Sequence, residues 1–433
     1  MNAITRRKFV QTGSSAAAVA AFSSRGAAAG ANSTVRVAVL GVNGRGADHI
    51  NVLRRLPGVE VAVLCDPDAK VLDRRVADLE KATGRKPAGE TDLRRVFERK
   101  DVDAVSIATP NHWHSLATIW ACQAGKDVYV EKPGSHNVFE GRKMVEAAHK
   151  YRRMVQHGVQ LRSSPAVREA IQHLRSGLLG KVYLARGIVY RWRPSIGRQP
   201  DEKTPPAELN WDLWQGPAQA RAFSRRLVHY NWHWHWEYGN GDVGNQGVHE
   251  TDLCQWGLDV ELPSKIVAMG GKFLWDDDKE TPEVLTTCYF YPELNRMIQF
   301  EVRHWCTNQE DGATVGNLFY GEKGYMVIKG YNSYATFMGQ KREPGPAKSD
   351  KGELELHFAN WIEAVRSRDA SKLHGPVESA HFSSALAHLG NISFRLGRNL
   401  TFDPKRERFV GDAEADAMLT RKYRAPYTVP AKV

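Results

Sequence analysis

Short, continuous apolar runs recur along the first third of the chain, and each is followed by a polar turn. These runs are 35–40, 59–65, 103–109 and 127–130. Continuous apolar runs of this length indicate strands that are buried on both faces, as in a parallel sheet. Helical spacing follows the turns at 47–55, 115–124 and 139–151. Strands that alternate with helices predict an α/β domain with a doubly wound parallel sheet over residues 32–156.

The pattern changes in the remainder of the chain. Strand-like runs and then helical runs occupy 182–190, 284–291, 296–303, 358–366 and 380–396. A stretch rich in proline, arginine and tryptophan at 194–230 predicts a long loop over the site, because long loops in compact domains are often functional. Since 433 residues are too many for one ordinary core, we expect a second α/β domain over 157–433.

The first 31 residues have the features of an export signal. Arg6 and Arg7 precede an alanine-rich run that ends near Phe22, and small residues follow at 27–29. Adjacent arginines before such a run are typical of a twin-arginine signal peptide. We therefore expect a periplasmic protein, or one otherwise exported by the twin-arginine route. The alternative is an accidental pair of arginines in a disordered tail. No apolar run is long enough to predict a membrane span.

Composition narrows the range of partners. The net charge of +11 is interpreted as a solvated basic surface, because basic clusters and a nucleic-acid-binding module are both lacking. The five cysteines lack CxxC spacing, which predicts free thiols and argues against zinc. The pairs His112/His114 and His233/His235 have no acid or cysteine cluster beside them, so no metal is expected.

A glycine-rich turn directly follows the first predicted strand. The candidate cofactor-binding residues there are Gly41, Asn43, Gly44, Arg45 and Gly46. Glycines let a backbone turn tightly and approach a pyrophosphate, and the following helix presents free N–H groups to the phosphates. The spacing is GxxGxG rather than GxGxxG, so the turn is modest evidence by itself.

An acidic residue ends the second predicted strand. Asp66 can accept hydrogen bonds from the hydroxyls of an adenosine ribose and would repel a 2′-phosphate. The cofactor is therefore expected to be NAD, and NADP is disfavoured. The alternative is that Asp66 caps a helix or is a turn residue before Pro67.

Polar residues also follow the third and fourth predicted strands. Thr109, Asn111 and His114 come after one strand, and Glu131 and Lys132 after the next. Because ligands bind at the carboxyl ends of such strands, all five are candidates for cofactor binding. The Lys132 ammonium would also stabilise a developing alkoxide on a substrate. The alternatives are a helix-capping Asn111 and a surface Lys132 paired with Glu131.

At Glu131-Lys132-Pro133 the chain resembles the Gfo/Idh/MocA family, which is named after glucose-fructose oxidoreductase and inositol dehydrogenase. The resemblance also includes the glycine turn, Thr109-Pro110-Asn111 with His114, the stretch 176–182, and a glycine-rich segment that ends in His249 and Asp252. It implies a Rossmann domain followed by an α/β domain on a large, open, mostly antiparallel sheet. It also implies a sugar or polyol substrate between that sheet and the nicotinamide, and a homo-oligomer, a dimer or tetramer.

The glycine-rich segment departs from the family pattern at one position. The family usually has an aspartate four residues before the histidine, whereas this chain has Asn245 before His249. His249 is the candidate general base, because imidazole titrates near neutrality. Asn245 can only orient a neighbour by hydrogen bonding. Asp242 is a candidate to replace the missing charge, but it lies three residues before Asn245 and would face a different way in most backbones.

Three more residues are candidates for substrate binding. Trp234 and His235 belong to a run of alternating tryptophans and histidines, and Arg162 follows a short apolar strand. Indole faces suit the C–H surfaces of sugar rings, whereas core packing of the tryptophans is the alternative. For Arg162 a surface salt bridge is the alternative.

These residues predict an NAD-dependent oxidoreductase that acts on a hydroxyl or keto carbon of a sugar, polyol or glycoside, with Lys132, Asn245 and His249 as catalytic residues. The first alternative is a redox-assisted, glycoside-cleaving enzyme with tightly bound NAD. The second is a non-catalytic sugar-binding protein.

Overall fold

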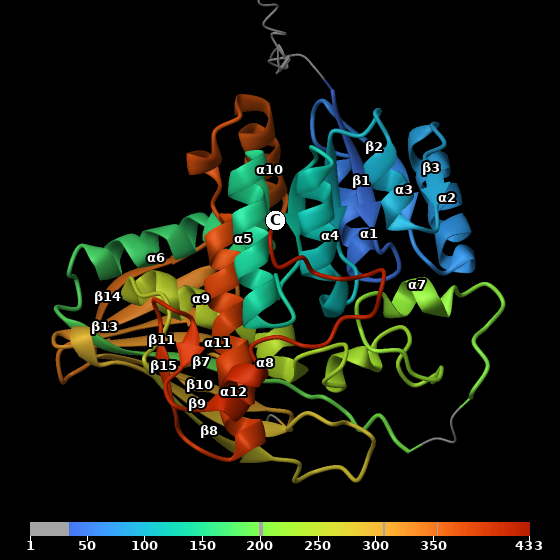
Figure 1. Ribbon diagram of the computed structural model, residues 1–433. Coiled ribbons are helices and arrows are strands. Elements are labelled where there is room, and N and C mark those ends of the chain that lie inside the picture. The colour runs from blue at the N-terminus through green and yellow to red at the C-terminus, as the bar shows by residue number, and fades with distance from the viewer. Residues whose placement is uncertain (1–33, 199–201, 306–307, 353) are drawn as a thin grey trace, which may run out of the picture.

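The computed structural model describes residues 34–198, 202–305, 308–352 and 354–433. Figure 1 shows two sheets, one in the blue N-terminal part and one in the part that runs from green to orange. Both the α/β class and the pairing of a parallel with a mostly antiparallel sheet are confirmed. The proposed signal peptide, residues 1–31, lies outside the described residues.

The N-terminal sheet has six parallel strands in the order β3-β2-β1-β4-β5-β6. This is the order of a Rossmann fold, in which the crevice lies at the carboxyl ends of the strands beside β1 and β4. In chain order, the strands β1 to β6 span Val35–Leu40, Val59–Cys65, Ala88–Glu90, Ala104–Ile107, Asp127–Val130 and Val155–His157.

Helices cover both faces of this sheet. The helices α1 to α5 span Arg45–Leu53, Ala69–Thr83, Leu93–Glu98, Asn111–Gln123 and Val138–Tyr151. The fourth helix begins four residues earlier than its pattern predicts, because Pro110 occupies its N-cap position. Residues 111–114 are therefore helical, and their side chains are buried.

The second sheet has ten strands in the order β14-β13-β12-β11-β7-β10-β9-β8-β15-β16, and only β7 and β10 pair in parallel. The strands β7 to β16 span Val182–Tyr190, Lys265–Gly271, Val284–Tyr291, Arg296–Arg303, Val315–Gly321, Gly324–Lys329, Ser333–Met338, Glu343–Ser349, Leu400–Asp403 and Arg408–Phe409. The expected strands at 182–190, 284–291 and 296–303 are confirmed at their predicted bounds.

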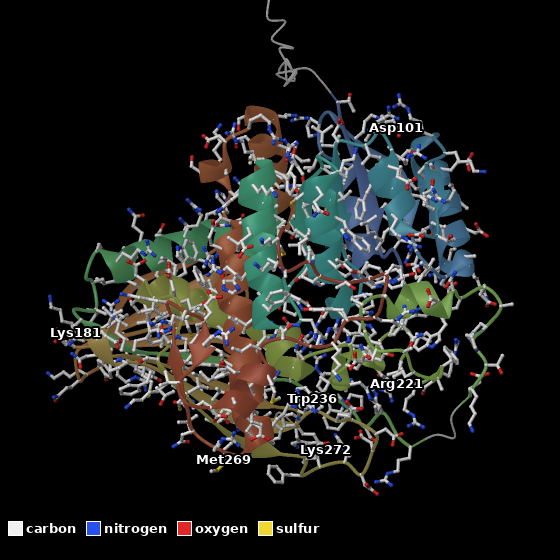
Figure 2. All side chains as sticks on the ribbon, in the orientation of Figure 1. Asp101, Lys181, Arg221, Trp236, Met269 and Lys272 are labelled. Carbon is white, nitrogen blue, oxygen red and sulfur yellow. The ribbon has the colours of Figure 1, made fainter. Side chains whose placement is uncertain are left out.

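One face of the large sheet is covered and the other is open. The helices α6, α9 and α11 share a core with the sheet; they span Pro165–Arg175, Gly247–Leu258 and Val377–Leu396. Burial alternates along β9 and β10, as expected for a sheet with one solvated face. Met269 is 79 % exposed and projects from the lower edge of the molecule in Figure 2, far from Asp101 on the Rossmann domain.

Segments from the C-terminal half return to the Rossmann domain. Helix α10 (Leu354–Ser367) contributes Phe358, which stacks on Tyr129 of β5 at 4.1 Å between ring centroids. The last residues pack Tyr427 against Trp113 of α4. The remaining short helices are η1, α7, η2, α8, η3, η4 and α12, which span Gln160–Ser163, Trp211–Gln215, Asn231–Trp234, Gly241–Asn245, Pro292–Leu294, Ala370–Lys372 and Ala413–Ala417.

The expected loop after β7 lies beside the Rossmann strand ends, with α7 at the lower right of Figure 1. The loop is hydrogen-bonded to the Rossmann domain at Asn210, whose backbone N–H donates to the carbonyl of Pro67 at 2.9 Å. Leu209, Trp214, Phe223 and other residues give it a small hydrophobic core of its own.

None of the described helices is long and apolar enough to cross a membrane. Cys65, Cys122, Cys254 and Cys288 are free thiols, as predicted, whereas Cys306 lies outside the described residues.

Candidate active site

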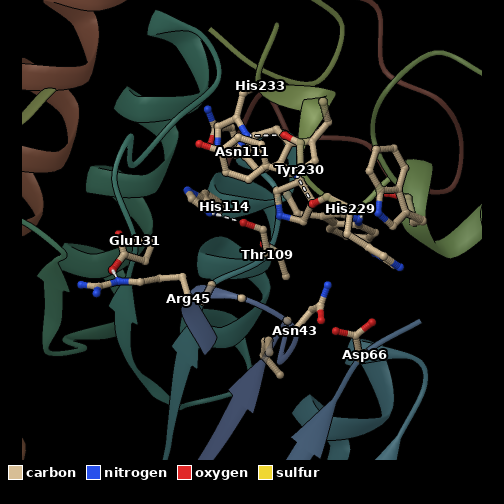
Figure 3. Close-up of a pocket in the computed structure, with 18 of the residues that line it drawn as sticks. Asn43, Arg45, Asp66, Thr109, Asn111, His114, Glu131, His229, Tyr230 and His233 are labelled. Atoms are coloured by element: carbon tan, nitrogen blue, oxygen red, sulfur yellow. Dashed lines mark hydrogen bonds and ion pairs between the residues drawn. The ribbon is translucent and has the colours of Figure 1, made fainter. Parts of the chain in front are cut away.

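A cavity of about 560 Å³ opens at the carboxyl ends of the Rossmann strands, between the two domains. This volume is typical of ligand and cofactor sites. Most of the residues predicted for the site line it: Gly41, Asn43, Gly44, Arg45, Asp66, Thr109, Asn111, His114, Glu131, Lys132, Asn245 and His249. Figure 3 shows Asn43 and Asp66 at one end, Arg45 beside Glu131, and His233 near Asn111 at the other end.

Each of the three glycines in the turn is required or tolerated for a different structural reason. Gly41 has φ +79°, and a Cβ there would lie 2.7 Å from the carbonyl oxygen of Ala108, so only glycine fits between β1 and β4. Gly46 lies behind the cavity wall, where a Cβ would meet the Gly41 carbonyl oxygen at 1.8 Å. At Gly44 a Cβ would meet nothing within 4 Å, so the cavity side of the turn is open to a ligand.

Asp66 faces the cavity at the tip of β2. Its carboxylate accepts hydrogen bonds from the backbone N–H groups of Val42 at 2.9 Å and Asp68 at 3.1 Å. Helix α2 is capped by Asp68, which accepts from the backbone N–H of Val71, so Asp66 is not the helix cap. The hydrogen bond that Asp66 accepts from Asp68, two residues further on, agrees with the other form of that alternative, a turn residue before Pro67. Burial raises the pKa of Asp66 to about 6.

Glu131 fixes Arg45 at the start of α1. The Arg45 Nε donates to Glu131 Oε1 at 2.7 Å, and the same oxygen lies 3.0 Å from Nε2 of the buried His49. Burial alone would raise the pKa of Glu131, but Arg45 and His49 hold it well below its usual value. The alternative of a surface lysine paired with Glu131 is also wrong, because the carboxylate is held by Arg45 and Lys132 is turned to Asn245.

His114 braces the polar loops of β4 and β5. Its Nδ1 and Nε2 lie 2.6 Å and 2.7 Å from the carbonyl oxygens of Pro133 and Thr109, respectively. The Lys132–Pro133 peptide is cis. Asn111 is the first residue of α4 and makes no side-chain cap; its Nδ2 donates to Oδ1 of Asn240 in the second domain at 3.3 Å.

The structure brings Lys132, Asn245 and His249 together. The Lys132 Nζ donates to the backbone carbonyl of Asn245 and, at 3.3 Å, to its side-chain Oδ1. His249 lies one turn further along and also lines the cavity. Burial lowers the pKa of Lys132 to about 8. Burial lowers the pKa of His249 well below its usual value, and the positive charge of the nearby Lys132 lowers it further. The imidazole is therefore neutral at pH 7.

Three predicted substrate residues lie away from the cavity. The Arg162 guanidinium forms a two-pronged ion pair with the buried Asp252, with Nε and NH2 at 2.7 Å and 2.9 Å from the two carboxylate oxygens. Trp234 packs against His304, and His235 pairs with Glu280 at 3.2 Å. Their neighbours Trp232 and His233, in the short helix η2, line the cavity instead.

The cavity contains residues that the sequence did not single out. Four of them belong to the run of alternating tryptophans and histidines and the residues just before it: His229, Tyr230, Trp232 and His233. Gln160, Gln246 and Tyr331 line the cavity from other segments. Gln160 follows the last parallel strand, a position from which the strand-end rule could have identified it. Tyr331 lies between two strands of the second sheet, and nothing in the local sequence distinguishes it.

The donor set of the cavity fits a dinucleotide and a polyhydroxyl substrate. Thr109 Oγ1, Gln160 Oε1 and His249 Nδ1 are buried and have no hydrogen-bond partner within the described part of the chain. Buried polar atoms are rarely left unpaired unless a ligand or water meets them. Over the residues that the structure describes, no group of three His, Cys, Asp or Glu side chains is arranged to hold a metal ion.

Two curated relatives match part of the chain. A glycosyl hydrolase family 109 protein of Saccharopolyspora erythraea is 34% identical over 169 residues, which are 37% of this chain and 36% of the relative. An alpha-N-acetylgalactosaminidase of Shewanella oneidensis is 35% identical over 118 residues, or 26% of each chain. The chain is thus matched to about a third or less of these relatives' length.

Solved structures share most of the fold at low sequence identity. The WlbA dehydrogenase of Bordetella pertussis, in complex with NADH and UDP-GlcNAcA, superposes with a TM-score of 0.65 at 19% identity and covers 86% of this chain and 99% of its own. An aldose-aldose oxidoreductase of Caulobacter crescentus, complexed with glycerol, gives 0.65 at 16% identity and covers 85% and 100%.

Two family models cover most of the described chain. Residues 35–159 match the oxidoreductase family's NAD-binding Rossmann fold, and residues 164–273 and 321–429 match its C-terminal alpha/beta domain. The first domain is therefore an NAD-binding Rossmann domain, and the protein belongs to the Gfo/Idh/MocA oxidoreductase family.

Proposed function

We propose that the protein is an NAD-dependent oxidoreductase that acts on a hydroxyl or keto carbon of a sugar, polyol or glycoside. One observation carries the proposal: the Lys132 ammonium and the neutral His249 imidazole line the same cavity as the dinucleotide-binding turn. The glycine turn and Asp66 would hold NAD, which would supply a hydride acceptor for the carbon that bears the reacting hydroxyl.

The chain's own residues divide the remaining work. The neutral imidazole of His249 accepts the hydroxyl proton, because its pKa is held well below the usual value and its Nδ1 has no partner among the described residues. The Lys132 ammonium stabilises the negative charge that develops on the oxygen. Trp232 and His233 stack on each other at 3.6 Å and offer an aromatic wall to the sugar.

A glycoside-cleaving reaction is the second candidate, and the names of the curated relatives favour it. A transient ketone on the sugar acidifies the neighbouring C–H bond. Loss of that proton together with the aglycone would leave a double bond in the sugar. Water would add a hydroxyl and a proton across it, and the reduced cofactor would supply the hydride that restores the alcohol, so that there is no net redox change. The same Lys132 and His249 would serve the oxidation and the reduction.

A panel of free sugars and nitrophenyl glycosides separates the two candidates. Net NADH or a keto sugar supports the oxidoreductase, and release of nitrophenol without net NADH supports glycoside cleavage. Lys132→Ala and His249→Gln are expected to lower kcat at least 100-fold in either case. The exposed Lys405→Ala is the matched control. Binding without turnover of any panel member, or full turnover by Lys132→Ala, contradicts the proposal.

We also infer that the protein is exported through the twin-arginine route by residues 1–31. An Arg6→Lys/Arg7→Lys variant is expected to stay in the cytoplasmic fraction, whereas unchanged fractionation contradicts the inference.

A homo-oligomer is supported by the open face of the large sheet, which carries Val267, Met269 and Phe290. Light scattering behind size exclusion tests it, and a monomer mass contradicts it.

A further inference from the structure

A buried ion pair lies behind Asn245, outside the residues that line the cavity. Asp242 in α8 is only 1% exposed. Its carboxylate accepts two hydrogen bonds from Arg193, at 3.0 Å from Nε and 2.8 Å from NH2, and Oδ2 lies 3.5 Å from Nε2 of His304. Burial alone would raise the pKa of Asp242, but His304 and Arg193 hold it well below its usual value. Asp242 is therefore ionised. It does not line the cavity, but its carboxylate contacts the side chain of Asn245.

This carboxylate determines which way the Asn245 amide points. The Asn245 Nδ2 donates to Asp242 Oδ1 at 3.3 Å, and its Oδ1 accepts from Lys132 Nζ at 3.3 Å. An ionised carboxylate can only accept hydrogen bonds and an ammonium can only donate them. The amide between them therefore has a single favourable orientation, with its oxygen toward Lys132.

We propose that Asp242 is a positioning residue for Lys132: it orients the Asn245 amide and supplies, through it, the negative charge that position 245 lacks. This inference rests on the proposed role of Lys132 in the reaction. The side chains form a continuous line in which the charges alternate, from Arg193 to Asp242 and, through the neutral Asn245, to Lys132.

Two ion pairs interact electrostatically with Lys132. They are Glu131 with Arg45 and Asp242 with Arg193. The other titratable groups that interact with Lys132 are His114, His233, His249 and Glu250. Removing the charge of Asp242 while Arg193 remains leaves an unbalanced cation near Lys132, which lowers the pKa of the ammonium.

The pKa of Lys132 can be measured without a substrate. Reductive methylation of the NAD-bound protein with ¹³C-formaldehyde labels its lysines, and the resonance that Lys132→Ala lacks belongs to Lys132. An opposite charge nearby shifts a pKa by about one unit or more. The titration midpoint is therefore expected to fall by about one pH unit in Asp242→Asn and to rise by about one unit in Asn245→Asp.

The combined variant Asp242→Asn/Asn245→Asp moves the carboxylate along the line and is expected to return the midpoint to that of the wild type. Asp259 forms an exposed ion pair with Arg175, and Asp259→Asn is the control that is expected to leave the Lys132 midpoint unchanged. An unchanged midpoint in Asp242→Asn overturns the inference. If Asp242→Asn does not fold, equal midpoints in Asn245→Asp and in the combined variant overturn it, because these two proteins differ only in the charge of residue 242. Full turnover by Lys132→Ala would instead refute the proposed function, even if the midpoints shift as expected.

Discussion

NAD affinity is expected to depend on pH through Asp66. The carboxyl group lines the cavity and has a pKa of about 6, because it is buried at the tip of β2. Ribose hydroxyls can donate hydrogen bonds to the ionised carboxylate, so bound NAD favours the ionised form. Below pH 6 the carboxyl group of the free protein holds a proton that must leave when NAD binds.

The size of this effect follows from the shifted pKa. If the complex keeps Asp66 ionised down to pH 5, linkage makes the Kd of NAD about tenfold higher at pH 5 than at pH 7. That ratio corresponds to about 1.4 kcal/mol of binding free energy. The sign is fixed by the direction of the pKa shift: affinity is lost as the pH falls through 6, and it does not change between pH 7 and 8.

Calorimetric titration with NAD at pH 5, 6, 7 and 8, in buffers of different ionisation enthalpy, measures both the Kd and the proton released. Asp66→Asn is expected to remove the pH dependence and to weaken NAD binding at pH 7 by about 10- to 100-fold. Asp92→Asn is the control, because Asp92 lines the same cavity but hydrogen bonds from Arg94 lower its pKa in spite of burial. An equal pH dependence in Asp66→Asn and wild type would refute this reasoning.

Three further perturbations test the structure. Asp252→Asn breaks a buried ion pair and should lower the free energy of unfolding by about 3 kcal/mol, measured by urea denaturation; a loss below about 1 kcal/mol contradicts the burial of the pair. Trp232→Ala should raise KM for the substrate, whereas Trp234→Ala should mainly lower the melting temperature, and the reverse pattern would place the wrong indole in the cavity. Gly44→Ala should fold normally but bind NAD more weakly, whereas Gly46→Ala should destabilise the Rossmann domain; normal NAD binding by both contradicts the glycine assignments.

Much of the fold and of the cofactor site could be predicted from the sequence. The continuous apolar runs mark buried strands, and the parallel topology brings their carboxyl ends to one crevice, so Asp66, Thr109 and Lys132 could be placed together. The limit came in irregular segments. η2 is a helix of four residues, too short for its period to appear in the sequence, so the sequence could not show that Trp232 and His233 face the cavity while Trp234 and His235 do not.

Long-range pairing could not be predicted either. Arg162 looked available to a substrate because its partner Asp252 is 90 residues away in the sequence. A separation of 49 residues likewise hid the contact between Arg193 and Asp242 that orients Asn245. Such partners depend on how η1 packs against α9 and on how the residues after β7 pack against α8, and no local pattern records that packing.

The central claim is that Lys132 and His249 act on the same substrate oxygen beside NAD. A crystal structure of the protein with NAD and the sugar identified by the panel tests it most directly. The account predicts that Lys132 Nζ and one imidazole nitrogen of His249 both lie about 3 Å from the reacting hydroxyl oxygen. If the two groups contact different substrate oxygens, or if either lies beyond hydrogen-bond reach of the reacting one, the claim is contradicted.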